Sequence, residues 1–470
     1  MSLSSEQEPS TYREAATQPC WQEAMNSEIR ALVLNHTWDI VQAPSNVRPI
    51  GCKWVYKIKR GPDGNIERYK ARLVAKGYSQ VEGIDYLEIF SPVVKMTTIR
   101  VILAIASINN WHLQQLDVSN AFLYGDLTED VYMTIPQGLH GYSPSQCYKL
   151  KKSLYGLKQT SRQWFAKLSH LLLSFGYTQA HADHSLFTKA TGSSFTTIVV
   201  YVDDIVLAGN SLVEIAHLKT SLRSHFNIRD LGKLKYFLGL EVAHSSSGLY
   251  LCQRKYCLDL ISDVALLNSK LSSTPMDPSL RLHQDSSAPL DDPLPYRRLV
   301  GRLIYLTNTR PDIVFATQQL SQFMGAPTHS HFQAALRVVR YLKSCPGKGL
   351  FFRRSSSLHL LGFSDADWAT CVDTRRSITG YCFFIGSSLV SWKTKKQSTI
   401  SRSSSKAEYR ALASATCELQ WLIYLFRDLH ISCNKCPVLH CDNQSALYIA
   451  ANPVFHERTK HLEIDCHLVR

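Results

Sequence analysis

The sequence predicts an α+β fold of two units in series, and three observations lead to this prediction. Strand-like apolar runs and amphipathic helical segments alternate through roughly the first half of the 470 residues. Residues 272–295, rich in serine, aspartate and proline, then have the composition of a linker. A new α/β pattern begins near Leu358. A chain of this length exceeds what one core normally holds, so more than one domain is expected.

The first unit is expected to combine hairpins with amphipathic helices. Residues 53–59 and 66–75 alternate on either side of the turn signal Gly-Pro-Asp-Gly-Asn, which predicts a hairpin. Residues 113–118 predict a strand, and residues 236–243 with 249–252 predict a further hairpin. Helical spacing predicts helices at residues 21–34, 97–108, 162–175 and 211–226, with a helical turn at 120–124.

The second unit is expected to begin with helices and to end as an α/β domain. The helices are expected at residues 296–306 and 329–344, after the linker. Strands fit residues 358–364, 380–385, 388–393 and 438–441, and a long helix fits residues 403–429.

Composition restricts the class of protein. Lys and Arg (52) exceed Asp and Glu (38) by 14, and the pI is about 9.1, which favours a polyanionic partner such as nucleic acid; an inert basic surface is the alternative. No apolar run approaches the ~18 residues that a membrane span needs, and the start of the chain lacks a signal peptide. The 13 scattered cysteines, an odd number, predict reduced thiols in an intracellular protein.

Two adjacent aspartates, Asp203 and Asp204, lie between β-branched runs that predict buried strands. Burying two carboxylates is costly unless they are paired or bind metal. The pattern therefore predicts a hairpin whose turn presents carboxylates to a hard divalent cation such as Mg²⁺. Asp117, near the end of another apolar strand, supplies a third carboxylate, and two-metal sites of this kind catalyse phosphoryl transfer. A polar turn without metal is the alternative, because aspartate is common in turns.

Longer motifs resemble one family. Tyr-Val-Asp-Asp at 201–204 resembles the central motif of reverse transcriptases, and Leu-Asp-Val at 116–118 with Ala-Phe-Leu-Tyr-Gly-Asp at 121–126 resembles Ty1/copia retrotransposons, especially plant copia elements. Further similar motifs are Lys-Ser-Leu-Tyr-Gly-Leu-Lys-Gln at 152–159, Tyr-Phe-Leu-Gly-Leu-Glu at 236–241, Arg-Pro-Asp-Ile at 310–313 and a ten-residue motif at 452–461. The resemblance extends from about residue 21 to residue 470.

The resemblance implies roles for residues of the first unit. Its polymerase triad, which would hold two Mg²⁺ ions with Mn²⁺ as the alternative ion, is Asp117, Asp203 and Asp204. The implied nucleotide-binding residues are Lys70, Arg72, Phe122 and Gln159, and the implied primer grip is Leu238, Gly239 and Leu240. The ring of Phe122 matches the side chain that excludes a ribose 2′-hydroxyl. Core packing is the alternative for Phe122, and a solvated strand face is the alternative for Lys70 and Arg72.

A second set of acids resembles the ribonuclease H part of the same polyproteins. Asp365, Glu408 and Asp442 lie in the matching motifs and would form a two-metal nuclease site. Members of the family continue past the equivalent of Arg470 into a helix with a fourth carboxylate, so the resemblance implies a truncated domain and impaired cleavage. Residues not assigned to the catalytic site are the nearby His456, His461, His467, Glu463 and Asp465.

The resemblance thus implies a right-hand reverse transcriptase with fingers, a ferredoxin-like palm and a thumb, followed by an α/β RNase H-like domain. The expected division is an N-terminal lead and helix (1–45), fingers and palm (46–255), thumb and connection (256–355) and the RNase H-like domain (356–470). Expected partners are an RNA template, a DNA primer, RNA–DNA hybrid, dNTPs and other Pol or Gag products, and no membrane. The expected location is the cytoplasm, in virus-like particles, with the nucleus as the alternative.

Two rival functions are compatible with parts of the sequence. A decayed retroelement relic would fold and bind nucleic acid without catalysis, although the intact polymerase triad favours activity. A zinc-dependent nucleic-acid-binding module would use Cys433, Cys436, His440 and Cys441. The last two flank Asp442 at the end of a predicted strand, and no second cysteine pair follows, so the zinc module is the weaker hypothesis.

Overall fold

The computed structural model describes residues 7–45, 47–60, 65–285, 287–433 and 435–451. The motif at 452–461 lies outside this part, as do His456, His461, Glu463, Asp465 and His467. The described residues form five sheets with helices packed against them, so the predicted mixture of helices and strands is confirmed. No helix within these ranges is long and apolar enough to cross a membrane.

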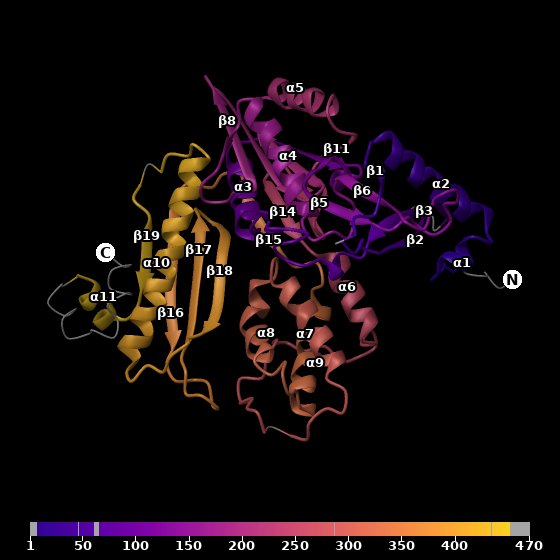
Figure 1. Ribbon diagram of the computed structural model, residues 1–470. Helices are drawn as coiled ribbons and strands as arrows, with labels where there is room; N and C mark the ends of the chain where they lie inside the picture. Colours follow the sequence, from indigo (N-terminus) through magenta and orange to yellow (C-terminus); the bar gives the residue numbers. More distant parts are fainter. Residues whose placement is uncertain (1–6, 46, 61–64, 286, 434, 452–470) are drawn as a thin grey trace.

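An N-terminal lobe contains a long hairpin and a small sheet, at the right of Figure 1. Its elements are α1 (Tyr12–Ala15), α2 (Pro19–Leu34), β1 (Trp38–Gln42), β2 (Cys52–Arg60), β3 (Ile66–Ala75), η1 (Gly77–Ser79), β5 (Asp126–Met133) and β6 (Gln146–Lys152). The predicted hairpin is formed by β2 and β3, and the small sheet has the order β1-β6-β5. Trp21 and Met25 of α2 pack with Tyr56 and Ala71 of the hairpin. The N-terminal helix is therefore part of this lobe.

A six-stranded sheet of order β11-β4-β10-β9-β8-β7 forms the centre of the molecule. The elements here are α3 (Met96–Ile108), β4 (His112–Val118), η2 (Ala121–Tyr124), α4 (Thr160–Ser174), β7 (Thr178–Gln179), β8 (Leu186–Thr191), β9 (Ser194–Tyr201), β10 (Asp204–Gly209), α5 (Leu212–Arg223) and β11 (Ile228–Lys233). Ile205 and Leu207 pack with α4 and α5, whereas Val206 and Ala208 pack with α3 on the other face. Both faces of β10 are therefore covered, which explains why residues 205–208 are apolar without interruption.

A four-stranded sheet and a group of helices follow. They comprise β12 (Tyr236–Phe237), β13 (Leu240–His244), β14 (Gly248–Cys252), α6 (Arg254–Asp263), α7 (Leu294–Leu306), η3 (Pro311–Ile313), α8 (Val314–Ser321), α9 (His329–Ser344) and β15 (Leu350–Arg353). The predicted linker contains no helix or strand in its described residues before α7. The strand predicted at 236–243 is wrong in one respect: Leu238 (φ 50°) and Gly239 (φ 69°) form a tight turn that divides it into β12 and β13.

The C-terminal elements form a sheet of order β18-β17-β16-β19, in which β16 and β19 are parallel. They are β16 (Leu360–Asp367), β17 (Ile378–Ile385), β18 (Ser388–Lys396), α10 (Ser404–Asp428), β19 (Val438–Cys441) and α11 (Gln444–Ala451). The long helix α10 runs along the sheet in Figure 1, and its small residues Ala407 and Ala411 contact Ala366 of β16. The α/β arrangement predicted for this region is confirmed.

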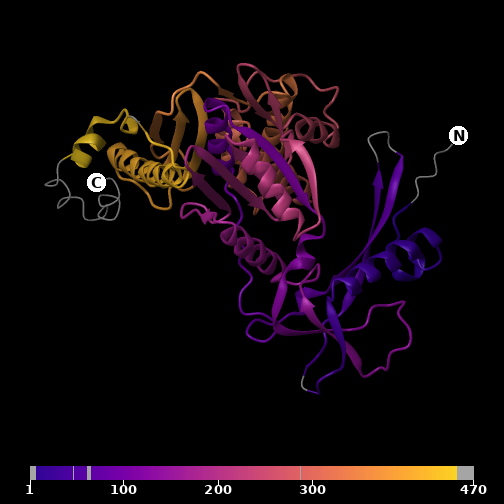
Figure 2. The same cartoon turned by 90° about the horizontal axis from the view of Figure 1, so that it is seen from above.

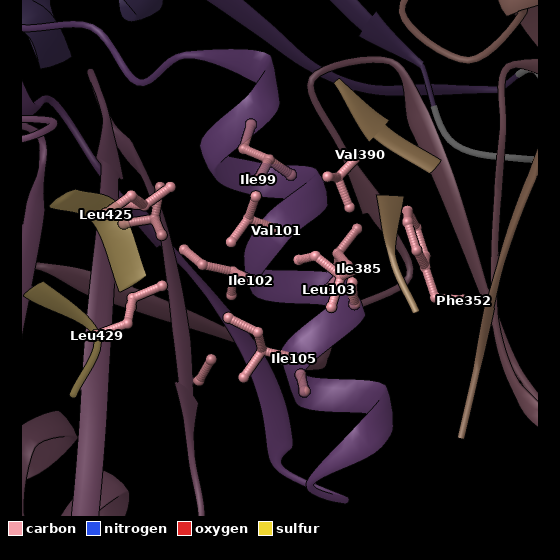
Figure 3. Packing of buried hydrophobic residues seen from close by; sticks show 14 of the residues in the cluster. Ile99, Val101, Ile102, Leu103, Ile105, Phe352, Ile385, Val390, Leu425 and Leu429 are labelled. Atoms are coloured by element: carbon pink, nitrogen blue, oxygen red, sulfur yellow. The ribbon is translucent and has the colours of Figure 1, made fainter. Parts of the chain in front are cut away.

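The central and C-terminal sheets share one core around α3. Every residue from Ile99 to Ser107 is buried, which is typical of a helix enclosed on all sides. Figure 3 shows α3 between Val390 and Phe352 on one side and Leu425 on the other. Figure 2 shows the C-terminal sheet beside the central one, while the hairpin β2–β3 extends away from both. The two sheets are therefore held together by a continuous apolar core.

Arg100 of α3 lies buried in this shared core and connects three regions. Its guanidinium donates to the carbonyl of Val390 (2.7 Å), the carbonyl of Asn308 (3.0 Å) and Oγ1 of Thr97 (3.1 Å). It also lies over the ring of Trp392, 4.0 Å from the centroid. Burial lowers the pKa of Arg100 to about 9.

Candidate active sites

The first site is built on the hairpin between β9 and β10. Tyr201 pairs with Asp204, which leaves Val202 and Asp203 as a two-residue turn. Val202 has a φ of 55°, a left-handed conformation that is unusual for a β-branched residue and often marks a functional turn. Trp164 of α4 holds this turn, because its Nε1 donates to the carbonyl of Val202 at 2.6 Å. The predicted hairpin is present, and its turn projects Asp203.

The register of the central sheet brings the third carboxylate to the same place. Asp204 of β10 is paired directly with Asp117 of β4. The N–H of Val118 donates to the carbonyl of Asp203 at 2.9 Å, which extends the pairing to the turn. Gln115 donates from Nε2 to Oδ1 of Asp204 at 3.2 Å. The structure thus assembles the three predicted acids on two adjacent strands and one turn.

The carboxylates interact electrostatically. Burial raises the pKa of Asp117, and the charge of Asp203 raises it further, while nearby cationic side chains act in the opposite direction. Burial also raises the pKa of Asp204, against the hydrogen bond from Gln115, and the charges of Asp203 and Asp117 add to the increase. Half-buried like charges of this kind favour a divalent cation, and their oxygens are ligands that Mg²⁺ and Mn²⁺ accept.

Two of the predicted nucleotide-binding residues, Arg72 and Phe122, contact Tyr155, a side chain that was not among the predicted site residues. The ring of Tyr155 lies 4.3 Å from the guanidinium of Arg72 and 5.3 Å from the ring of Phe122. Lys70 precedes Arg72 on β3 by two residues, so both project from the same face of the strand. Nε of Arg72 is buried and lacks a hydrogen-bond partner among the described residues. The signal for Tyr155 was present, because it lies within the motif at 152–159.

Gln159 has a different environment. Its side chain is fully buried, its Oε1 accepts from Nε2 of Gln80 at 3.0 Å, and its Nε2 donates to the carbonyl of Asp85 at 3.1 Å. Both ends of the amide are therefore used inside the protein, where they fix the loop around Gln80 to the start of α4. A role of Gln159 in nucleotide binding stays a prediction.

The implied primer grip is the turn between β12 and β13. The hydroxyl of Tyr305 on α7 donates to the carbonyl of Leu238. A Cβ at Gly239 would lie 2.9 Å from the Tyr305 hydroxyl oxygen, so the positive φ and the close approach both require glycine there. Leu240 follows the turn and is buried. Tyr305 was missed, because no motif links α7 to a turn that precedes it by more than sixty residues.

The second site lies at one end of the C-terminal sheet. Ser364 of β16 pairs in parallel register with Cys441 of β19, so the next residues, Asp365 and Asp442, lie side by side where this pairing ends. Asp442 follows the end of β19, whereas Asp365 is still part of β16 and pairs with Gly380 of β17, so the expectation that Asp365 leaves its strand is wrong. Glu408 approaches from the first part of α10. The structure therefore assembles the three predicted acids from three elements.

Glu408 is the buried member of this site. Its side chain is only 6% exposed, and its Oε2 has no hydrogen-bond partner in the described part of the chain. Burial and the charge of Asp365 are the main causes that raise the pKa of Glu408 to about 7. Ligand atoms of Glu408, Cys441 and Asp442 all lie within 4.8 Å of one another. No other trio of His, Cys, Asp or Glu within the described ranges is as close, so the first site's acids are more widely spread.

The zinc ligands of the rival hypothesis are not assembled among the described residues. The thiol of Cys433 donates to the carbonyl of Leu358, at 3.9 Å. The ring of His440 stacks on Phe363, with 5.1 Å between centroids. Cys441 instead lies beside Glu408.

Comparisons with known proteins identify the family. Residues 35–278 match the family model described as reverse transcriptase (RNA-dependent DNA polymerase). The whole chain is 45% identical to the retrovirus-related Pol polyprotein from transposon RE1 of Arabidopsis thaliana and covers 32% of that protein. It is 37% identical over its whole length to the corresponding polyprotein from transposon TNT 1-94 of Nicotiana tabacum, and covers 36% of it. The chain thus spans about a third of the length of these relatives.

A solved structure has a similar fold. It is the foamy viral protease-reverse transcriptase in complex with RNA/DNA hybrid, with a TM-score of 0.50 and 11% sequence identity. The match covers 96% of this chain and 52% of the viral chain. The family match and the relatives agree with the motifs of the central sheet. The chain belongs to the reverse transcriptase family, and within it to the Pol polyproteins of copia-type retrotransposons.

Proposed function

We propose that this chain is an RNA-directed DNA polymerase with an attached RNase H-like domain. The observation that carries the proposal is the register pairing of Asp117 with Asp204, next to the turn that presents Asp203. None of the three carboxylates has an ion-pair partner among the described residues. Asp117 and Asp204 are in addition half-buried and have raised pKa values, which is typical of functional rather than structural groups.

The proposed division of labour follows the regions of the fold. The N-terminal lobe would serve as fingers and the six-stranded sheet as palm. The helices α6–α9 would serve as thumb and connection, and the C-terminal sheet with α10 as the RNase H-like domain. Template, primer and hybrid are the proposed nucleic-acid partners, in line with the charge surplus of 14 (52 − 38). The proposed location is cytoplasmic virus-like particles, with the nucleus as the alternative.

In the proposed reaction the primer 3′-hydroxyl gives up its proton to solvent, and its oxygen forms a bond to the α-phosphorus of a dNTP while the bond from that phosphorus to the bridging oxygen breaks and pyrophosphate leaves. Asp117, Asp203 and Asp204 would hold two divalent cations, Mg²⁺ or Mn²⁺. Bound there, these cations would supply charge neutralisation and alignment for the in-line displacement. Lys70 and Arg72 would balance the charge of the triphosphate. In the second site, Asp365, Glu408 and Asp442 would hold cations for hydrolysis of the RNA strand of a hybrid.

The selection of dNTPs over rNTPs that we propose depends on Phe122 and on the ring of Tyr155 that packs against it. Phe122 would exclude the ribose 2′-hydroxyl, and Tyr155 would keep its ring in place from behind. The T-shaped contact of the two rings supports this role, and so does the position of Tyr155 next to Arg72. Leu238 and Gly239, held by Tyr305, would position the primer end.

Primer extension by the purified chain tests the proposal. With Mg²⁺, dNTPs and a primed RNA template, the wild type should extend the primer. Asp203→Asn should reduce extension at least a hundredfold, because it removes a metal ligand, while template binding in a gel-shift assay should stay nearly intact. A matched control is Asp130→Asn, at an exposed acid of β5 that pairs with Lys149. A wild type that binds template without extending it would instead support the decayed relic.

A further inference from the structure

We propose that Glu408, Cys441 and Asp442 form a binding site for a thiophilic divalent cation, Zn²⁺ in the first place. This donor set differs from the three carboxylates expected of a nuclease, because it contains a sulfur atom and does not require Asp365. It also differs from the cysteine–histidine set of the zinc-module hypothesis, since it contains neither Cys433 nor Cys436. The binding itself does not depend on the proposed nuclease activity.

The geometry of the three side chains is close to that of a zinc site. Their ligand atoms all lie within 4.8 Å of one another. Zinc bonds of about 2.0–2.3 Å would set donor atoms roughly 3.5 Å apart, so a shift of about an ångström or less per side chain closes the site. The thiol of Cys441 projects from the last residue of β19, and Asp442 follows it directly, which fixes both donors on one short piece of backbone. Three protein ligands leave the fourth position of a tetrahedral zinc open.

Glu408 supplies an independent indication that this site takes a cation. Its side chain is 94% buried, given its 6% exposure, yet Oε2 has no hydrogen-bond partner in the described ranges. A buried carboxylate oxygen without a donor is strongly disfavoured unless a cation or another partner satisfies it. Cys441 is partly buried and packs against Tyr409 and Ala446, which places its sulfur beside Glu408.

The sulfur donor determines which ions compete for the site. Mg²⁺ prefers oxygen ligands and gains little from a thiolate, whereas Zn²⁺, Cd²⁺ and Co²⁺ bind sulfur well. Binding would release the thiol proton of Cys441 to solvent as the thiolate coordinates the metal. A further consequence rests on the proposed function: zinc at Glu408 and Asp442 would occupy two of the three nuclease ligands and would inhibit hybrid cleavage.

The test uses Co²⁺ as a spectroscopic probe, followed by competition with Zn²⁺. Addition of Co²⁺ to the reduced full chain should produce a sulfur-to-cobalt charge-transfer band, and Zn²⁺ should remove it. Cys441→Ser should lower the intensity of the charge-transfer band, because the sulfur of this site is removed. Glu408→Gln should weaken Co²⁺ binding at least about tenfold. The double variant Cys433→Ser/Cys436→Ser should keep the band. Circular dichroism of each variant checks folding, and Cys441→Ala provides a second test if the serine variant does not fold.

Two results would overturn the proposal. One is a cobalt spectrum that is unchanged in both Cys441 variants. The other is loss of the band in the double variant, which would assign the metal to Cys433 and Cys436 and support the zinc module. Neither result bears on primer extension, so failure of this inference and failure of the proposed polymerase are distinguishable.

Discussion

The two carboxylate sites differ in how the chain assembles them. In the first, one strand pairing places Asp117 opposite Asp204, and a tight turn adds Asp203 at the surface. In the second, a helix brings the buried Glu408 to the place where the parallel pairing of β16 with β19 ends. An open site of oxygen donors suits hard cations that also coordinate substrate phosphates. The second site places a buried carboxylate beside a partly buried thiol and an exposed carboxylate, and the proposed preference for thiophilic cations depends on that thiol. The difference teaches that residues outside the acid motifs decide which donor atoms a site offers.

Asp312, which belongs to neither site, is by contrast a carboxylate with a structural role. It accepts hydrogen bonds from Arg310 (2.9 Å), Tyr341 (2.7 Å) and Lys348 (3.2 Å). Burial alone would raise the pKa of Asp312, but the hydrogen bonds from Arg310 and Tyr341 hold it well below its usual range. Carboxylates with cation partners stabilise the fold, and carboxylates without them are candidates for metal binding.

The largest expected effect concerns this paired acid. Asp312→Asn should destabilise the helices α7–α9 by about 3–5 kcal/mol, because the buried guanidinium of Arg310 loses its counter-charge. The measurement is the midpoint of urea unfolding at pH 7. Asp263→Asn is the control, since its ion pair with Arg302 is largely exposed on the acid side and should contribute less than about 1 kcal/mol.

The same residue predicts a dependence on pH. Because the folded pKa of Asp312 is lowered, its contribution to stability is present above the unfolded value of about 3.9 and is lost as the pH falls through the folded pKa. Below about pH 4 the wild type should therefore lose stability that Asp312→Asn has already lost, and the two unfolding midpoints should approach each other. Parallel curves across this range would contradict the assignment.

The next effect concerns the core that joins the two sites. Arg100→Met should destabilise the protein by about 3 kcal/mol, because the carbonyls of Val390 and Asn308 would be buried without donors. Central and C-terminal sheets should still unfold together, as the apolar contacts of α3 remain. Arg427→Met, at an exposed arginine of α10, is the matched control. Separate unfolding transitions in the wild type would show that α3 does not couple the regions.

A smaller effect is expected for sugar selection at the first site. Phe122→Ala should lower the preference for dNTPs over rNTPs about tenfold to a hundredfold, because a bulky ring no longer excludes the 2′-hydroxyl. Tyr155→Leu should lower the same ratio less, since it removes only the support of that ring. Single-nucleotide incorporation kinetics give both ratios. If neither ratio falls, Phe122 is a packing residue.

The smallest effect is expected at the turn between β12 and β13, the proposed primer grip. Tyr305→Phe removes only the hydroxyl that binds the Leu238 carbonyl and should raise the KM for primer-template about threefold, with kcat nearly unchanged, which corresponds to roughly 0.6 kcal/mol. A structural defect would instead lower the amount of active enzyme and leave KM unchanged. Tyr256→Phe is the control: its ring contacts Tyr305 edge-on, and its hydroxyl donates to Arg302 instead of to the turn.

Much of the architecture could be predicted because its signals are local. The strand β3, the helix α9 and the strand β19 have the predicted bounds, since apolar spacing alone defines them. The division of 236–243 into two strands could not be predicted, because Leu238 rarely adopts a positive φ and interrupts no apolar pattern. The strands of the small sheet were missed as well, because β1 and β6 pair across more than a hundred residues.

The sequence predicted which acids form the candidate sites, but it did not predict the burial or the neighbours of their side chains. The sequence placed Cys441 next to Asp442 without showing that α10 would bring Glu408 to its sulfur. It placed Gln159 in a nucleotide-binding motif without showing that Gln80 and Asp85 would occupy its amide. Burial and hydrogen-bond partners depend on residues distant in the chain, so a motif identifies the chemistry of a side chain better than its contacts.

The most direct test of the account compares primer extension by two variants, one from each site. We expect Asp203→Asn to lose extension at least a hundredfold and Glu408→Gln to extend within about twofold of the wild type, because the proposed polymerase reaction uses only the first set of acids. Both variants should bind primed template with similar affinity. Extension that survives in Asp203→Asn, or that falls equally in Glu408→Gln, would contradict the assignment of separate functions to the two sites.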